Sequence, residues 1–263
     1  MPEQSADQAS HRRAQLYDEI LFSAAMRGFY GDDYYNVGLW AETTGGAAEA
    51  CAALVSRVAG EVHTPPKRIL DAGCGVGGST RAIARCWPEA EVVGIGISER
   101  QLEHARAVCP TATFTLMDAA AMTFADASFD AVIAIESALH FDTRERFFAR
   151  AARILRPGGS IALADLLVPS RHWPGAWNVP ADNLGWATVA RYAEALQGAG
   201  FSDIKACDVT TRTWDAYLTR FSAHVETLAS DDTANMSWRA SARALREAEP
   251  PCYVLASARI PTA

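Results

Sequence analysis

The stretch ILDAGCGVGGST, residues 69–80, decides the fold of this chain. A short apolar run ends at Asp71, four glycines follow within residues 73–78, and a helix is predicted to begin at Ser79. Glycine at a strand-to-helix turn adopts positive φ and lets a ligand approach the bare backbone. The stretch therefore predicts a small-ligand site where the first strand of an α/β sheet ends.

The glycines alone allow three kinds of ligand. A nucleoside triphosphate loop requires Gly-Lys-Ser/Thr, and here Gly78 is followed directly by Ser79. Residues 73–78 satisfy the dinucleotide pattern GxGxxG, but the second predicted strand ends at Gly96, where an acid should hold the ribose, and Asp71 would repel a pyrophosphate. A ligand with an ammonium group, a carboxylate and an adenosine, but no phosphate, would use Asp71 as an acceptor. S-adenosylmethionine has this composition.

Length, charge and cysteine content narrow the class of protein. The 263 residues suffice for one domain with an appended cap, no apolar run approaches the ~20 residues of a membrane span, and the polar N-terminus lacks a signal-peptide core. We therefore expect a cytoplasmic protein without a membrane partner. A formal net charge of −7 argues against nucleic acid, and six cysteines without a CxxC pair predict reduced thiols and no metal. Arginines at helical spacing predict a solvated helix face, formed by Arg144, Arg146, Arg150, Arg153 and Arg156.

From Arg68 onward, apolar runs alternate with amphipathic segments. One helix between successive strands implies parallel pairing and an open α/β sheet. The helix that ends the alternation is predicted to stop at Pro157-Gly158-Gly159. The predicted strands are 68–72, 91–96, 112–117, 129–135 and 160–167, and the predicted helices are 14–30, 45–59, 79–86, 99–108 and 144–155.

The C-terminal part follows a different pattern. Residues 168–186 hold three prolines, two glycines and three tryptophans, which predicts an irregular insertion. A helix within 187–201, a strand within 202–214, helices near 214–229 and 236–247 and a strand over 252–260 follow. We expect an N-terminal helical cap over residues 1–60 and a core over 61–263 that carries the insertion as a substrate lid.

Several ordered motifs resemble those of class I S-adenosylmethionine-dependent methyltransferases. DAGCGVG resembles the first motif, VVGIGISERQLEHAR follows the second strand, LMDAAAMTFADASFDAVIAIES spans the third and fourth, and ILRPGGSIALADLL enters the fifth. The likeness covers roughly residues 15–210 and the closing YVLASARIP. It is nearest to small-molecule enzymes of the tocopherol and ubiquinone type and to natural-product sugar O-methyltransferases of the rebeccamycin kind. It implies a Rossmann-like, seven-stranded, mostly parallel sheet with a C-terminal antiparallel strand, helices on both faces, and S-adenosylmethionine as cofactor.

The resemblance also implies which residues hold the donor. Asp71 is expected on the ammonium side and Asp118 at the adenine amino group, although a cap or turn aspartate is the alternative for Asp118. Tyr17 and Trp40 resemble the aromatic faces of a lid over the sulfonium, and packing between two helices explains them equally well. The candidate donor-binding residues are Tyr17, Trp40, Asp71, Gly73, Gly75, Gly77, Ile97, Ser98, Gln101, Asp118, Ala119 and Glu136.

The ribose is the point where the sequence departs from the family pattern. Gly96 occupies the position at which the family usually has an acid. Some relatives carry a small polar residue in a similar G-I-x-x-S context, and here Ser98 follows Ile97. We therefore expect the ribose contacts to come from the backbone around Ile97 and from the side chains of Ser98 or Gln101.

Two residues are the catalytic candidates. His140, in IESALHF, lies just after the fourth strand and stands where the resembled sugar O-methyltransferases have their proposed base. Asp165, in ALADLL, ends the neighbouring strand, where the carboxylate would assist the imidazole or bind substrate. The resemblance also includes relatives that methylate carbon, in which the alternative roles of such a histidine are to orient the substrate or merely to pack. A metal-assisted mechanism would use Glu136 and an Asp-Asn pair, but Leu166 follows Asp165, so no metal is expected.

The acceptor is indicated only by its surroundings. Trp173, Trp177 and Trp186 in the insertion, with Phe141 nearby, predict an apolar or aromatic small molecule beneath a lid. Packing in the core is the alternative, especially for the phenylalanines of the 144–155 helix. The preferred function is an O-methyltransferase of natural-product metabolism. Transfer to carbon or nitrogen, an NAD(P)-dependent oxidoreductase and a catalytically silent donor-binding domain are the alternatives, and homo-oligomerisation stays open.

Overall fold

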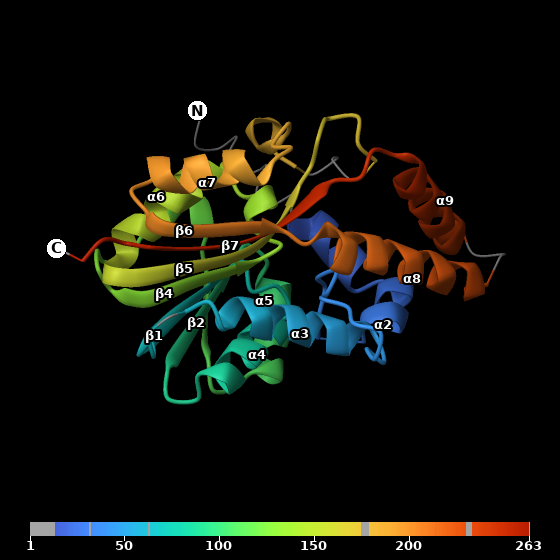
Figure 1. Cartoon of the computed structure of the whole chain (residues 1–263). Coiled ribbons are helices and arrows are strands. Elements are labelled where there is room, and N and C mark those ends of the chain that lie inside the picture. Colours follow the sequence, from blue (N-terminus) through green and yellow to red (C-terminus); the bar gives the residue numbers. More distant parts are fainter. Residues whose placement is uncertain (1–13, 32, 63, 175–178, 230–232, 263) are drawn as a thin grey trace, which may run out of the picture.

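A seven-stranded sheet in the order β3-β2-β1-β4-β5-β7-β6 forms the centre of the computed structural model (Figure 1). The structure describes residues 14–31, 33–62, 64–174, 179–229 and 233–262. β7 runs antiparallel to both of its neighbours, and the pairs among β1 to β5 are parallel. This confirms the Rossmann-like sheet with a C-terminal antiparallel strand. The strands are β1 Arg68–Ala72, β2 Glu91–Gly96, β3 Thr113–Leu116, β4 Phe129–Ile135, β5 Leu155–Leu167, β6 Ser202–Asp208 and β7 Cys252–Arg259.

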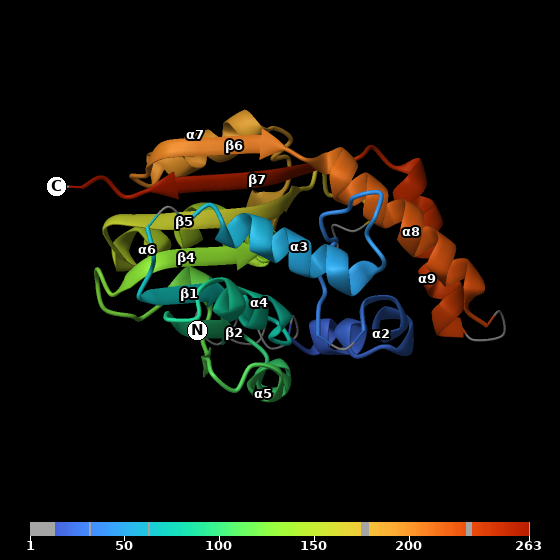
Figure 2. The same ribbon diagram turned by 60° about the horizontal axis from the view of Figure 1, so that its bottom comes forward.

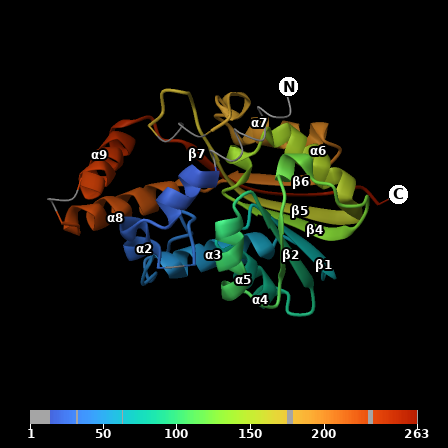
Figure 3. The same cartoon turned by 180° about the vertical axis from the view of Figure 1, so that it is seen from behind.

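Helices cover both faces of the sheet and one of its ends (Figures 1 and 2). One face carries α3 Ala47–Ala59, α4 Gly78–Cys86 and α5 Glu99–Val108, and the other carries α6 Arg144–Ile154 and α7 Val189–Gly198. Beyond the carboxyl ends of the parallel strands lie α2 Ala24–Tyr30, α8 Trp214–Thr227 and α9 Thr233–Glu247 (Figure 3). No helix in the described part of the chain has the length and apolar character needed to cross a bilayer.

The alternation of side chains along the central strands builds two cores. Ile69 and Ile133 point to the face covered by α3 and α4, whereas Leu70 and Val132 point to the face covered by α6 and α7. All four side chains are fully buried. Because each such burial contributes about 1.5–3 kcal/mol, the central strands hold both helical layers against the sheet.

Two predicted boundaries were wrong. The helix predicted over 14–30 is two helices, residues 14–21 and α2, because the Ser23 hydroxyl accepts a hydrogen bond from the Met26 amide and starts a new helix. The helix over 144–155 ends at Ile154, and Pro157-Gly158-Gly159 lies inside β5. Backbone bonds from Gly158 to Ile260 and from Ile260 to Gly159 extend the strand, and a residue before proline favours extended backbone.

The arginine row is a solvated face only in part. Arg146 and Arg150 are exposed as predicted, but Arg144 is fully buried. Its position at the first turn of α6 directs it inward, toward Asp165 at a distance of 2.8 Å. A buried guanidinium requires such a partner, and helical spacing alone does not reveal one.

Candidate functional site

A pocket lies at the carboxyl ends of the parallel strands, where the loops after β1, β2, β3 and β4 meet the N-terminal segment. This is the place where an open α/β sheet binds ligands. The loop after β5, the remaining strand of the parallel set, does not line this pocket. The lining residues include Tyr17, Leu21, Tyr35, Gly73, Gly75, Gly96, Ile97, Gln101, Met117, Asp118, Ala119, Ile135, Glu136, Ser137, His140 and Phe141.

The glycine loop after β1 presents bare backbone to the pocket. Gly73 has φ +81°, and a Cβ there would lie 2.4 Å from the Cβ of Ser137. Gly75 has φ +52°, and a Cβ there would project into open space at the pocket wall. Gly77, with φ +95°, does not line the pocket, because it packs against Ala105 of α5. Of the three predicted glycines, Gly73 and Gly75 therefore line the pocket and Gly77 does not, and the contact of a ligand with the loop amides stays a prediction.

Asp71 lies beneath this loop and does not line the pocket itself. Its Oδ2 accepts hydrogen bonds from the hydroxyls of Ser79, at 3.0 Å, and Thr80, at 2.7 Å, while its buried Oδ1 has no partner among the described residues. Burial raises the pKa of Asp71 to about 6, against the lowering effect of the two hydroxyls. A buried acceptor without a partner fits a cationic donor group nearby, and the predicted ammonium role stays a prediction.

Asp118 and Ala119 line the pocket after β3. Oδ1 of Asp118 accepts a hydrogen bond from the Ala120 amide at 2.7 Å and thereby caps the short helix Ala119–Ala121. The capping role, given above as the alternative, is therefore present. A carboxylate has a second oxygen, so the cap and the predicted contact to adenine are compatible.

The predicted ribose ligands contact a residue that sequence reasoning missed. Ile97 and Gln101 line the pocket, and Ser98 caps α5 by accepting a bond from the Gln101 amide at 3.2 Å. The Ser98 hydroxyl and the Gln101 Nε2 both donate to Oδ1 of Asp18, each at 2.8 Å. Asp18 lies in the N-terminal helix, 80 residues away in sequence from Ser98, and no local pattern marks it.

The two aromatic lid candidates lie in different places. Tyr17 lines the pocket, and its ring meets the half-buried His140 ring edge-on at a centroid distance of 5.2 Å. Trp40 does not line this pocket: its Nε1 donates to the Val37 carbonyl at 2.6 Å, and the Arg220 guanidinium lies 4.4 Å from its ring centroid. Of the two, only Tyr17 is therefore placed as a lid residue would be.

Glu136 follows β4 and faces the same pocket. Its Oε1 accepts hydrogen bonds from the Val37 amide at 2.8 Å and from the Tyr253 hydroxyl at 2.6 Å. Burial raises the pKa of Glu136 to about 7, the two hydrogen bonds oppose this, and the charge of Asp165 adds to it. Glu136 thus joins the β4 loop to the segment after α2 and to β7.

Asp165 lies behind the β4 loop instead of lining the pocket. The carboxylate is fully buried, with Oδ2 accepting from Arg144 Nε at 2.8 Å and Oδ1 from the amides of Leu139, at 3.1 Å, and Leu166, at 2.9 Å. Leu139 directly precedes His140, so Asp165 fixes the backbone that carries the imidazole.

Asn183, in the insertion, completes this arrangement and was not predicted. Its Nδ2 donates to the carbonyls of Leu139, at 3.0 Å, and Phe141, at 2.7 Å, and its Oδ1 accepts from the Arg144 amide at 2.9 Å. The Arg144 guanidinium donates to the Asn183 and Leu166 carbonyls at 2.7 and 2.8 Å. We call the fully buried Arg144, Asp165 and Asn183 the loop clamp.

The tryptophans of the insertion do not surround the pocket. Trp173 is buried against Trp214, with ring centroids 5.2 Å apart, and Trp186 is buried against Tyr192 on the other side of the sheet. Trp177 lies outside the described residues. Phe147 and Phe148 are core residues, so Phe141 is the one aromatic residue that lines this pocket among those named for the acceptor and described by the structure. Within the described ranges, no group of three His, Cys, Asp or Glu side chains is placed to hold a metal ion.

Comparison with known proteins gives the family. A family model described as "Methyltransferase domain" matches residues 69–159. The chain is 33% identical to a 27-O-demethylrifamycin SV methyltransferase of Amycolatopsis mediterranei, over 91% of this chain and 94% of the relative. It is 32% identical to a 2-methyl-6-phytyl-1,4-hydroquinone methyltransferase of Synechocystis over 59% of this chain, which spans about half (53%) of that protein.

Solved structures share the fold. The crystal structure of the [4+2]-cyclase SpnF superposes with a TM-score of 0.76 at 24% identity, covering 95% of each chain. At this identity the likeness shows the fold alone. Family membership therefore rests on the relatives that share sequence as well as on the glycine loop and its pocket. The chain belongs to the class I S-adenosylmethionine-dependent small-molecule methyltransferases.

Proposed function

We propose that this methyltransferase transfers the methyl group to an oxygen atom of a small, apolar or aromatic metabolite, with His140 as the general base. The observation that carries the proposal is that His140 and the glycine loop line one pocket, so the imidazole lies on the donor side of the sheet. The relative that matches over nearly the whole chain is named for a 27-O-demethyl substrate, which favours oxygen as the acceptor atom.

The chain's own residues would position the acceptor and take its proton. When bound, the donor supplies a methyl group on a positively charged sulfur, ready for in-line displacement. His140 accepts the proton of the acceptor hydroxyl, a role that typically contributes about 10²–10⁴-fold. Asp165 assists through the backbone, because its carboxylate holds the Leu139 amide and not the pocket itself. Asp165 is thus a positioning residue in this proposal.

Residues of the strand-end loops and of the N-terminal segment would bind the donor together. Gly73 and Gly75 present the amides, Asp118 accepts from the adenine amino group, and Tyr17 covers the sulfonium end. The N-terminal segment through α2 acts as the cap together with α8 and α9, whereas α3, which the predicted 1–60 cap included, covers a face of the sheet. The apolar wall formed by Leu21, Ile135 and Phe141 supports an apolar acceptor.

The test first identifies the methyl acceptor and then measures the contribution of His140 to turnover. The purified protein is incubated with isotope-labelled donor and an extract of its host, and the methylated product is identified by mass spectrometry. With that acceptor, we expect His140→Ala to lower kcat by about 10²–10⁴-fold while the donor Kd measured by calorimetry stays within a few fold.

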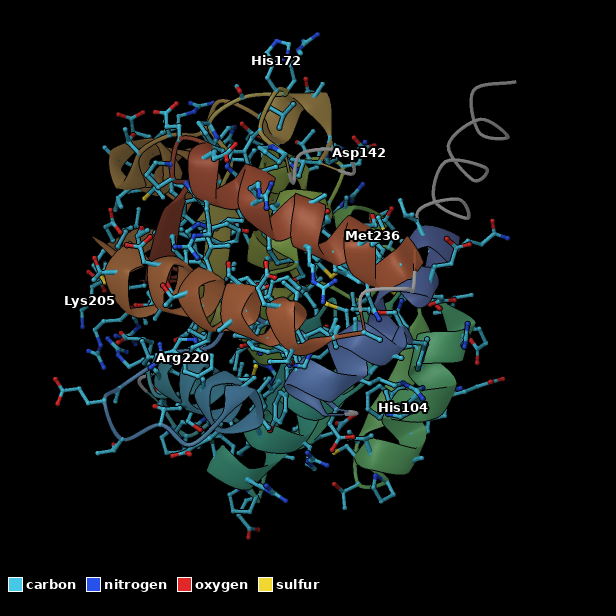
Figure 4. All side chains as sticks on the ribbon, turned by 90° about the vertical axis from the view of Figure 1, so that its right-hand side faces the viewer. His104, Asp142, His172, Lys205, Arg220 and Met236 are labelled. Carbon is cyan, nitrogen blue, oxygen red and sulfur yellow. The ribbon has the colours of Figure 1, made fainter. Side chains whose placement is uncertain are left out.

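His172→Ala is the matched control, because His172 is exposed on the insertion and points away from the molecule in Figure 4. Near-normal kcat in His140→Ala would refute the general base. A product methylated on carbon or nitrogen would refute oxygen transfer and leave His140 to orient the substrate.

A further inference from the structure

The N-terminal helix, residues 14–21, meets α5 through one carboxylate. Oδ1 of Asp18 accepts hydrogen bonds from the Ser98 hydroxyl and from Gln101 Nε2, both at 2.8 Å. Ser98 is the N-cap of α5, so the carboxylate also lies at the positive end of that helix. Nearby, the Phe22 ring is 4.2 Å from the Arg100 guanidinium, which adds a second contact between this segment and α5.

The contact decides how Gln101 faces the pocket. An ionised carboxylate only accepts hydrogen bonds, so the amide nitrogen of Gln101 must be the atom that faces Asp18. The carbonyl Oε1 is then left as the acceptor on a side chain that lines the donor pocket. Ser98 is less available, because its hydroxyl donates to Asp18 and accepts from the Gln101 amide.

The same region lacks the acid that a ribose needs. Ribose hydroxyls donate hydrogen bonds and therefore require acceptors. The pocket wall at the end of β2 includes Gly96 and Ile97, neither of which has a polar side chain. We propose that Asp18 takes over the task of the acid missing at position 96. It fixes Gln101 with Oε1 toward the ribose of S-adenosylmethionine, and it thereby makes docking of the N-terminal helix part of donor binding.

Docking and donor binding are coupled because the helix touches the site at two points. Asp18 holds the α5 side, and Tyr17, its neighbour in sequence, meets His140 on the β4 side. A ligand that uses Gln101 therefore favours the docked helix, and loss of Asp18 must weaken that ligand. The inference concerns the donor alone, so it stands or falls separately from the choice of acceptor atom or base.

The test measures binding of S-adenosylhomocysteine and of its 2′,3′-dideoxyribose analogue by calorimetry. Hydrogen bonds to charged groups of this kind lead us to expect that Asp18→Ala raises the Kd for S-adenosylhomocysteine about tenfold or more. For the dideoxy analogue we expect nearly the same Kd in Asp18→Ala as in the wild type, because the analogue lacks the hydroxyls through which Asp18 acts. Glu19→Ala, on an exposed side chain of the same helix, is the matched control and should bind both ligands as the wild type does.

Restoring the family acid supplies a second readout. A Cβ at Gly96 would lie 3.5 Å from Leu102 and 3.9 Å from Cys74, which are ordinary contacts. Gly96→Asp should therefore bind S-adenosylhomocysteine well, and Gly96→Asp in the Asp18→Ala background should recover most of the lost affinity. Wild-type affinity in Asp18→Ala, an equal loss for both ligands, or no recovery in the double variant would each overturn the proposal.

Discussion

At the scale of single residues, Glu136 combines a left-handed backbone with a raised pKa at the wall of the pocket. Its φ of +50° is uncommon for a residue other than glycine and costs on the order of 1 kcal/mol or more. The hydrogen bonds from Val37 and Tyr253 hold the side chain in place. Strain and a perturbed carboxyl at one position are typical of functional sites.

The pH dependence of stability tests this environment. The folded state keeps a proton on Glu136 up to about pH 7, whereas the unfolded chain releases it near its ordinary value of 4.5. Between these values the folded state binds more protons, so the free energy of unfolding of the wild type falls as pH rises. Glu136→Gln does not ionise and keeps an oxygen that accepts both bonds. We expect its stability relative to the wild type to increase from pH 5 to pH 8 in urea denaturation.

Titration of Asp71 cancels from the stability difference between Glu136→Gln and the wild type, because its pKa of about 6 contributes equally to both proteins. A stability difference that stays constant between pH 5 and pH 8 would contradict the raised pKa of Glu136.

At the scale of elements, the loop clamp joins three segments behind His140. Asp165 comes from β5, Arg144 from α6 and Asn183 from the insertion, and together they hold the short helix Ala138–His140. The insertion therefore supplies a structural residue to the site. Deleting residues 169–185 would therefore remove Asn183 from the clamp together with most of the insertion that was predicted to be a lid.

Removing only the positive partner of the clamp should lower the free energy of unfolding more than removing both of its charges. Arg144→Met leaves the Asp165 carboxylate buried without a counter-charge, and we expect the free energy of unfolding to fall by about 3–5 kcal/mol. The double variant Arg144→Met/Asp165→Asn removes the charge but keeps an acceptor for the Leu139 amide, so it should be more stable than Arg144→Met alone. Denaturant unfolding at pH 7 measures both.

Arg146→Met, two positions along α6 and exposed, serves as the control and should change stability by less than about 0.5 kcal/mol. Equal losses in Arg144→Met and in the double variant would show that the buried charge is not the cause.

At the scale of the whole molecule, a cap of segments far apart in sequence closes the carboxyl end of the sheet. Viewed from that end, α2, α8 and α9 form the near layer (Figure 4). Trp40 joins the N-terminal part of the cap to its C-terminal part. The Trp40 amide donates to the Arg212 carbonyl at 2.8 Å, and Arg220 of α8 covers the indole ring. This position gives Trp40 a role in packing the cap.

Opposite effects are expected for the two aromatic residues first assigned to the lid. Trp40→Ala should lower the free energy of unfolding by about 3–5 kcal/mol while the donor Kd of the folded protein changes by less than about threefold. Tyr17→Ala, at a half-buried position that lines the pocket, should raise the donor Kd with a smaller loss of stability. Denaturation and calorimetry on both variants decide this, and a tenfold loss of donor affinity in Trp40→Ala at unchanged stability would contradict it.

The sequence by itself determined the sheet, the glycine loop and the placing of His140 and Asp118 at one pocket. These follow from local rules: apolar periodicity marks each strand, glycines mark the turn, and parallel strands bring their following loops to one edge. The bounds of β1, β2 and β4 were predicted to the residue. The insertion was also recognised, from its prolines and glycines.

Only the tertiary structure decided which side chains meet. Asp18 contacts Gln101 across 83 residues, Asn183 contacts Leu139 across 44, and Trp40 lies against Arg220 and does not line the pocket. Such pairs depend on how separate elements dock, and a buried charge such as that of Arg144 shows no local difference from a solvated one. The physical reason is that burial and partnership belong to the packed interface, whereas the period of a helix or strand belongs to the chain.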